Sequence, residues 1–162
     1  MGDIPIIDPD ITMASTLPSK YYTEPTVFDQ IISKFGNHWH FAAHKNQLDR
    51  LNVMPLNDFE SLTKEPLVIT NDGTNLRCLS NVCTHRGMII TNEPCSSKVL
   101  KCPYHGRTFD LNGKFTNMPE FGKVENFPTK DDNLAESPLE MWNGLLFTTL
   151  KATSFQDWIA PI

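Results

Sequence analysis

The sequence predicts an all-β domain, an antiparallel β-sandwich with one N-terminal helix, and three observations support this fold class. From residue 38 onward, apolar residues occur in short runs bounded by turn residues. The tetrapeptides at 71–74 and 110–113 contain Asn, Asp and Gly in the order that is typical of tight turns. No part of the chain alternates strands with helices, so a parallel βαβ sheet is excluded.

The elements follow in order along the chain. Residues 1–20 predict an irregular arm, because three prolines remove backbone donors there. Residues 24–35 predict a helix, since apolar side chains recur at helical spacing and Gly36 can end it. Thr23 can cap this helix, and we expect its apolar face to lie on a sheet. Strands are expected at 38–44, 54–59, 66–71, 75–80, 88–91, 98–101, 107–110 and 144–150.

Length and composition place the chain among globular proteins. It has 162 residues, a net charge of −5 and 40% hydrophobic residues, which is enough for one domain with a core. The acidic balance argues against a nucleic-acid or anionic-membrane partner. No apolar run approaches the ~18 residues that a membrane span needs. The N-terminus lacks the basic and apolar regions of a signal peptide, so we expect a cytoplasmic protein.

Four cysteines, Cys78, Cys83, Cys95 and Cys102, admit disulfides, a metal site or free thiols. A cytoplasmic location disfavours disulfides. Cys78 and Cys95 are most simply a buried apolar residue and a loop thiol.

The other two cysteines each lie beside a histidine in a short segment that ends in Gly. The segments are Cys83-Thr84-His85-Arg86-Gly87 and Cys102-Pro103-Tyr104-His105-Gly106, which together read C-x-H-x16-C-x2-H. Thiolate and neutral imidazole are both metal ligands, so the two loops can hold a metal centre between them. A glycine after each histidine lets the backbone approach that centre closely.

Other interpretations of this pattern are weaker. Zinc fingers group like ligands as C-x2-4-C and H-x3-5-H, whereas each loop here mixes Cys with His. A plant-type four-cysteine cluster needs C-x4-C-x2-C, and the gap after Cys83 is too long for it. A catalytic Cys-His pair would leave the second pair unexplained.

The pattern resembles the Rieske [2Fe–2S] family. That resemblance implies that Cys83 and Cys102 bind the inner iron, and that His85 and His105 bind the outer iron nearer solvent. Neutral imidazoles in place of two thiolates raise the reduction potential above that of an all-cysteine cluster. Arg107 stands where respiratory-chain members usually have a serine hydroxyl on a sulfide, which implies a potential near the low end, roughly −150 mV.

The wider chain resembles the N-terminal Rieske domain of ring-hydroxylating oxygenase large subunits over about residues 21–150. Met88 and Tyr104 stand where respiratory members have disulfide-forming cysteines. Arg107 stands where these oxygenases commonly have Trp, which puts the packing and electrostatics beside the cluster in question. By the same resemblance, Met118 and Pro119 belong to a third loop that shields the cluster.

This implies an N-terminal arm (1–20), a Rieske domain (21–150) with a cluster-binding subdomain at about 81–122, and an apolar C-terminal tail (151–162). The tail is expected to dock on this domain or on a missing partner. No His follows His105, so the chain cannot supply the two histidines and carboxylate of a mononuclear Fe(II) site downstream. We therefore expect electron transfer without oxygenase activity from this chain alone, as part of a longer subunit.

The expected electron donor is a ferredoxin or flavin reductase, and the acceptor is an oxygenase catalytic domain, typically in a neighbouring subunit of a homotrimer. A stand-alone Rieske ferredoxin and a structural zinc module remain the alternatives.

Three further histidines, His38, His40 and His44, fall on one face of a strand by alternation. They admit a second metal site, although structural hydrogen-bonding roles are the simpler interpretation.

Overall fold

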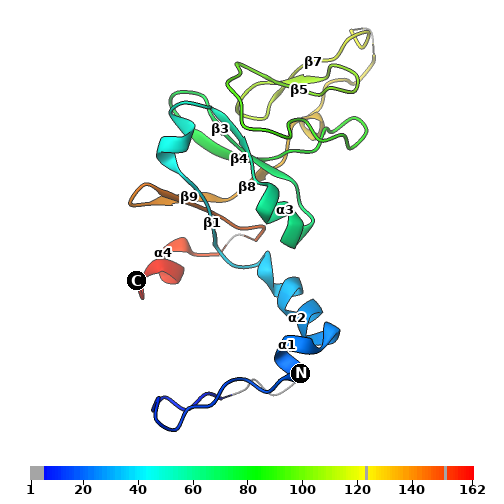
Figure 1. The fold of residues 1–162 in the computed structure, drawn as a ribbon. Coiled ribbons are helices and arrows are strands. Elements are labelled where there is room, and N and C mark those ends of the chain that lie inside the picture. The colour runs from blue at the N-terminus through cyan, green and yellow to red at the C-terminus, as the bar shows by residue number, and fades with distance from the viewer. Residues whose placement is uncertain (1–5, 123, 152) are drawn as a thin grey trace. The chain divides into compact units, whose positions relative to one another are not determined.

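The computed structural model describes residues 6–122, 124–151 and 153–162 (Figure 1). The chain forms two compact units, Met1–Phe35 and Gly36–Ile162. Within the described part of the first unit lie the helices α1 (Lys20–Thr23) and α2 (Pro25–Phe35). The predicted N-terminal helix is therefore confirmed. Within this unit, none of the α2 residues is buried.

The second unit contains the strands and the remaining helices. The strands are β1 (His40–His44), β2 (Val53–Pro55), β3 (Leu67–Asn71), β4 (Leu76–Ser80), β5 (Leu100–Lys101), β6 (Thr108–Phe109), β7 (Phe115–Asn117), β8 (Glu136–Ser137), β9 (Leu139–Trp142) and β10 (Leu145–Thr148). The helices are the 3-10 turns η1 (Lys45–Leu48) and η2 (Lys130–Asp132), and the α-helices α3 (Asn57–Thr63) and α4 (Phe155–Ile159).

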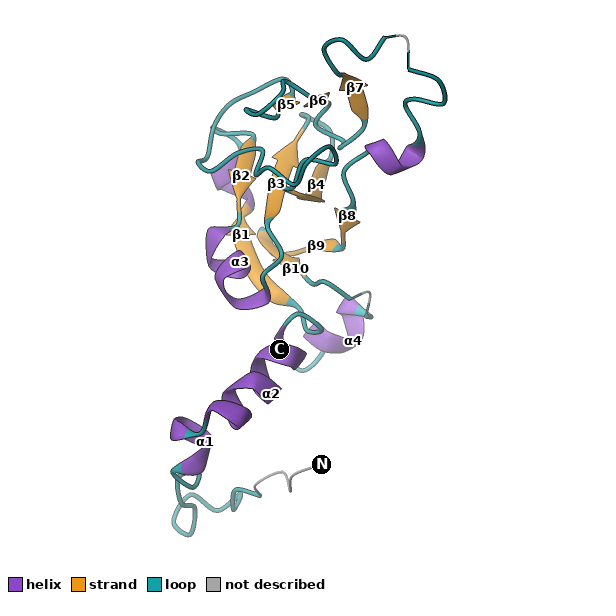
Figure 2. Cartoon of the chain, turned by 90° about the vertical axis from the view of Figure 1, so that its right-hand side faces the viewer, coloured by secondary structure: helices purple, strands orange, loops and turns teal. Residues whose placement is uncertain are grey.

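These strands make three sheets, in the orders β1-β10-β9, β2-β3-β4-β8 and β5-β6-β7. Every strand pair is antiparallel, which confirms the predicted fold class. In both ribbon views the β5-β6-β7 sheet lies at the end of this unit opposite α4 (Figures 1 and 2).

The central sheet is covered on both faces, as β3 shows. Its alternate residues Leu67 and Ile69 belong to a core cluster that includes Ala43 of β1, whereas Val68 belongs to a second cluster with Phe109 of β6. Successive strand residues point to opposite faces, so β3 separates two cores. The second core positions the predicted ligand loops, because Cys83 and Cys102 are part of it.

Both predicted turns are present. Gly73 and Gly113 have positive φ angles of 93° and 80°, which Gly adopts without strain. In the first turn the Asp72 carboxylate accepts hydrogen bonds from the N–H groups of Thr74 and Asn75, at 2.8 and 2.7 Å. The strands expected at 66–71 and 75–80 are confirmed by β3 and β4, which this turn joins.

One predicted strand is too long and another is wrong. The 54–59 segment begins in β2, and its second half lies in α3 with Phe59 buried. In the 88–91 segment the structure has only an isolated bridge between Val82 and Ile89. Here the Asn81 side chain, rather than a neighbouring strand, bonds the backbone of Thr91 at 2.7 and 3.1 Å.

The sequence also missed several short elements. The strands β7, β8 and β9 were not predicted, and α3 and α4 add helices to the single one expected. Among the residues that the structure describes, no helix has the length and apolar character that crossing a membrane requires.

Candidate metal centre

The first predicted ligand loop is a tight turn that Cys83 opens. The Cys83 N–H donates to the Met88 carbonyl at 2.8 Å, and the Gly87 N–H donates to the Cys83 carbonyl at 3.0 Å. Gly87 closes the turn with a φ of 68°, a left-handed conformation that favours glycine. His85 lies inside this turn and is therefore carried by a loop with a fixed backbone.

The second loop repeats the same backbone bonds. The Cys102 N–H donates to the Arg107 carbonyl at 2.8 Å, and the Gly106 N–H donates to the Cys102 carbonyl at 3.1 Å. Gly106 has a φ of 74°. The two loops are thus one structural motif used twice, which explains why Gly follows at the same distance from each cysteine, although His105 sits one position later in its loop.

The structure brings the four predicted ligands together as two like pairs. Cys83 and Cys102 are each only 2% exposed, and their side chains lie within hydrogen-bonding reach of one another. The rings of His85 and His105 face each other with centroids 4.8 Å apart. His85 is half-buried and His105 is exposed, so the thiols lie inside and the imidazoles outside.

The surroundings of Cys83 and His85 shift the pKa values of their side chains. Burial raises the pKa of the Cys83 thiol, while the His85 N–H and the Arg107 guanidinium oppose that rise. Loss of contact with water lowers the pKa of His85, and the neighbouring His105 and Arg86 lower it further. A lowered pKa favours neutral imidazole, the form that binds a metal.

This donor set fits a binuclear cluster, with two thiols for one iron and two imidazoles for the other. Among the described residues, no three His, Cys, Asp or Glu side chains form a group suited to a single metal ion.

A third loop lies beside the imidazoles. A shallow pocket is lined by His85, His105, Met118, Pro119, Glu120 and Phe121. The Phe121 ring lies edge-on to His85 with centroids 5.9 Å apart. The structure therefore places Met118 and Pro119 in one pocket with His85 and His105, where the resemblance predicts a shielding loop.

Arg107 is the functional neighbour whose contacts the sequence did not reveal. It is 3% exposed and ion-pairs with Asp132 at 2.6 Å. It also donates to the Thr84 hydroxyl at 2.7 Å, and its guanidinium lies over the rings of Phe115 and Phe127. Asp132 is 25 positions away in sequence, and the adjacent Asp131 gives the same local signal, so no sequence pattern singles it out.

The remaining cysteines and histidines have structural places. Cys78 is fully buried, and Cys95 is partly buried against the core that contains Cys83 and Cys102. All four cysteines are free thiols. The His44 Nδ1 accepts from the Asn46 N–H at 3.2 Å and caps η1, which is the hydrogen-bonding role expected of it. A bulge between Phe41 and Ala43 interrupts the alternation on which a second metal site depended.

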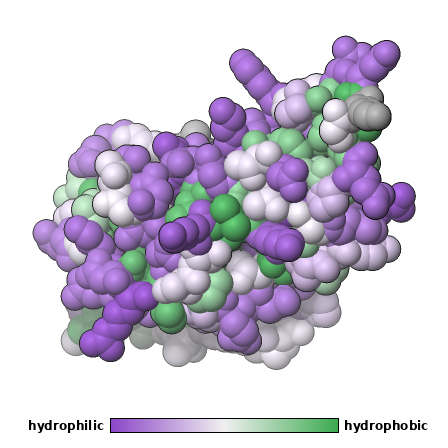
Figure 3. All heavy atoms as spheres, turned by 90° about the horizontal axis from the view of Figure 1, so that it is seen from above, coloured by the Kyte–Doolittle hydropathy of each residue, from purple (hydrophilic) through white to green (hydrophobic). Residues whose placement is uncertain are grey.

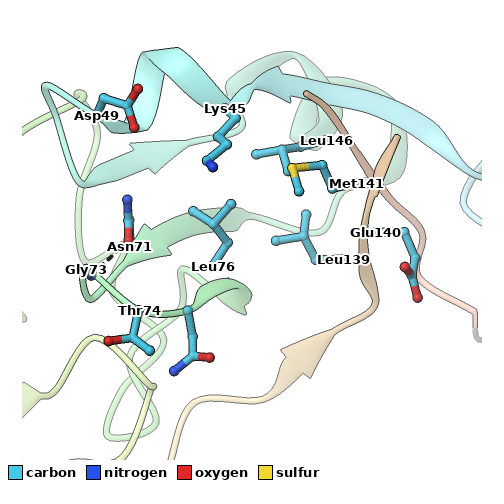
Figure 4. A pocket seen from close by; sticks show the side chains of 11 residues that line it. Lys45, Asp49, Asn71, Gly73, Thr74, Leu76, Leu139, Glu140, Met141 and Leu146 are labelled. Atoms are coloured by element: carbon cyan, nitrogen blue, oxygen red, sulfur yellow. Dashed lines mark hydrogen bonds between the residues drawn. The ribbon is translucent and has the colours of Figure 1, made fainter. Parts of the chain in front are cut away.

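A separate hollow is lined by residues of η1, the β3–β4 hairpin, β9 and β10 (Figure 4). Its lining includes Lys45, Asp49 and Glu140 but none of the four predicted ligands. By contrast, the end of the molecule that carries β5 and β7 shows apolar patches among polar ones (Figure 3). Exposed apolar residues near the ligand loops are Met88, Val99, Tyr104 and Val124.

Comparisons with known proteins bear on this site. Residues 38–128, more than half of the chain, match the Rieske [2Fe-2S] domain family. The carnitine monooxygenase oxygenase subunit of Escherichia coli is 28% identical over 148 residues, which cover 89% of this chain and 39% of that protein. The putrescine 2-hydroxylase of Ralstonia nicotianae is 31% identical over 134 residues, covering 81% of this chain and 34% of that protein.

A solved structure agrees with this likeness. The quaternary ammonium Rieske monooxygenase CntA in complex with L-carnitine superposes with a TM-score of 0.78 at 28% identity, covering 90% of this chain and 42% of that chain. The present chain thus spans about two fifths of the length of such relatives.

Proposed function

This chain belongs to the Rieske [2Fe-2S] domain family, and we propose that it carries single electrons to a mononuclear non-heme iron that lies in another domain. It is the Rieske domain of a Rieske oxygenase-like protein, and such a domain implies a [2Fe–2S] cluster. In the proposed assignment, Cys83 and Cys102 hold one iron, and His85 and His105 hold the other.

The observation that carries this proposal is the pairing of two loops with the same backbone turn, with thiols inside and imidazoles outside. When bound, the cluster accepts and releases one electron. The buried Cys83 and Cys102 keep water from the sulfur side of the site. His85 and His105 lie nearer the surface, where a redox partner can approach them. Short backbone hydrogen bonds in both loops hold all four side chains in place, so that little rearrangement accompanies transfer.

The proposed partners follow from the relatives. We propose a ferredoxin or flavin reductase as donor and an oxygenase catalytic domain as acceptor. Inter-subunit electron transfer has been described for the quaternary ammonium Rieske monooxygenase, which supports an acceptor iron in a neighbouring subunit. We propose that the full-length form is a homotrimer. We also propose residues 81–122 as the cluster-binding subdomain within a Rieske domain of residues 21–150, with an arm at 1–20 and a tail at 151–162.

The test is to reconstitute the chain with iron and sulfide and to measure both contents, the visible absorption and the EPR spectrum of the reduced form. We expect two irons and two sulfides per chain with mixed Cys and His ligation. Cys102→Ser should lose the cluster, whereas Cys95→Ser, the matched control at a partly buried cysteine outside the ligand set, should keep it. A colourless wild-type protein that binds one zinc would refute the assignment.

A further inference from the structure

We propose that Arg107 is a positioning residue that fixes the two ligand loops to each other and raises the reduction potential of the site through its buried positive charge. This inference rests on the proposed function, because it needs a cluster between the loops. Arg107 directly follows His105-Gly106 in the second loop, so its backbone and side chain both belong to the site.

The contacts of its side chain join three segments. The Arg107 Nη1 donates to the Thr84 hydroxyl at 2.7 Å, and Thr84 lies between Cys83 and His85 in the first loop. The Thr84 hydroxyl in turn donates to the Asp132 carbonyl at 2.9 Å. The Arg107 Nη2 donates to the Asp132 carboxylate at 2.6 Å. A side chain of the second loop therefore sets the position of the first loop, and η2 supports both.

The guanidinium of Arg107 is buried, and one of its nitrogen atoms makes no hydrogen bond to the described residues although Asp132 balances its charge. The Arg107 side chain is 4% exposed, and its Nε has no hydrogen-bond partner among the described residues. The rings of Phe115 and Phe127, at 5.0 and 5.3 Å, attract a cation but carry no counter-charge. A buried polar group without a partner is uncommon and calls for an explanation. We explain the burial of this guanidinium by a favourable electrostatic interaction between its positive charge and a nearby negative group.

The orientation of the ion pair gives the sign of this field. The guanidinium bonds Thr84, within the first ligand loop, whereas the second carboxylate oxygen of Asp132 accepts from the Thr129 N–H in the η2 turn. The positive end of the pair is thus bonded to the ligand loops. Burial strengthens such a field, because little water screens it.

The redox step then has a defined charge balance. One electron arrives from the reductase or ferredoxin, no bond forms or breaks, and the site gains one negative charge. A fixed cation beside the loops stabilises the reduced state more than the oxidised state. Removing that cation should therefore lower the potential.

The experiment measures the reduction potential of the reconstituted chain and of four variants by EPR-monitored titration. Arg107→Met removes the charge and keeps an unbranched side chain, and we expect the one-electron equilibrium to shift at least tenfold toward the oxidised state, which is about 59 mV. Arg107→Lys keeps the charge and should recover most of that shift. Arg77→Met is the matched control, since Arg77 also forms an ion pair, with Glu136, but is more exposed and lies outside the ligand loops, and solvent should limit its shift to less than twofold.

The fourth variant should shift the reduction potential in the opposite direction. Asp132→Asn removes the counter-charge of Arg107 and should raise the potential, so the proposal stays testable if Arg107→Met does not fold. A purely structural role would lower iron content without moving the potential of the clusters that remain. A shift for Arg107→Met no larger than for Arg77→Met, or a fall for Asp132→Asn, would overturn the proposal. Absence of a cluster from the wild-type chain would instead refute the proposed function.

Discussion

Cys78 shows how burial alone changes the chemistry of a thiol outside the ligand set. It lies in the core between β4 and the β1-β10-β9 sheet, and the Thr148 hydroxyl is its polar neighbour at 3.4 Å. Burial disfavours the thiolate and raises the pKa of Cys78 from 9.0 to about 12. The buried thiol therefore stays protonated in the folded protein over a range in which the unfolded chain releases the proton.

This shift predicts a loss of stability at alkaline pH. The folded pKa is raised, so the folded state binds the proton more tightly, and the stabilisation is complete below about pH 9 and lost as pH rises toward about 12. The unfolding free energy should fall by about 1.4 kcal/mol per pH unit over that window. Denaturant unfolding of Cys78→Ala against wild type checks this, with Cys95→Ala as control. A difference in stability between Cys78→Ala and wild type that stays constant with pH would contradict the prediction.

For single residues, the sequence predicted motifs of neighbouring residues but not contacts between residues far apart in the chain. Cys83 and His85 are two positions apart, so the sequence alone indicates that they can bind a metal together. Gly87, two positions further on, indicates the turn that carries them. The pairing of Arg107 with Asp132 depends on how β6 and η2 meet, which no local signal encodes. The Arg107 position was noted as a departure from the family, but its contacts could only come from the fold.

Two turn glycines allow conformational strain to be separated from packing. Gly73 and Gly113 both have positive φ, but a Cβ on Gly73 would meet no atom within 4 Å, whereas one on Gly113 would lie 3.0 Å from Leu79 and 3.3 Å from Leu134. Gly73→Ala should cost about 1–2 kcal/mol, from the left-handed backbone alone. Gly113→Ala should cost about 1–3 kcal/mol more, from overpacking of the core beside the ligand loops.

Equilibrium unfolding in denaturant measures both losses on the same scale. Because Leu79 and Leu134 belong to the core that contains Cys83 and Cys102, Gly113→Ala should also reduce cluster incorporation, whereas Gly73→Ala should not. Equal destabilisation by the two substitutions would show that the core beside Gly113 yields without strain.

The sequence predicted the β3–β4 hairpin well, but it missed β7, which follows the other predicted turn. The hairpin of β3 and β4 combines an Asn-Asp-Gly turn with two apolar runs, so local and tertiary preferences agree. The segment at 54–59 has no such agreement. Its apolar residues fit either alternation or a helical turn, and the buried position of Phe59 in α3 is decided by tertiary packing.

Among the described residues of the second unit, buried apolar side chains form three clusters, and one of these clusters contains Cys83 and Cys102, the proposed ligands. The core at α4 lies at the end of this unit opposite β5-β6-β7 (Figure 1). Its buried residues are Trp39, Phe147, Phe155 and Ile159. The apolar tail that the sequence singled out thus supplies Phe155 to this core, with its ring 5.1 Å from that of Trp39. The sequence left open whether the tail docks here or on a partner, because apolar character alone does not identify what it contacts.

This separation predicts that stability and cluster properties can be changed independently. Phe155 and Phe109 are 5% and 0% exposed, and each substitution to alanine should cost about 3–5 kcal/mol of unfolding free energy. Phe155→Ala affects the core at α4, so the fraction that remains folded should keep the wild-type iron content and potential. Phe109→Ala opens a cavity in the core that holds Cys83 and Cys102, so it should lose iron at equal thermal destabilisation. Calorimetry together with iron analysis distinguishes the two, and a loss of iron from folded Phe155→Ala would show that the cores at opposite ends of this unit are coupled.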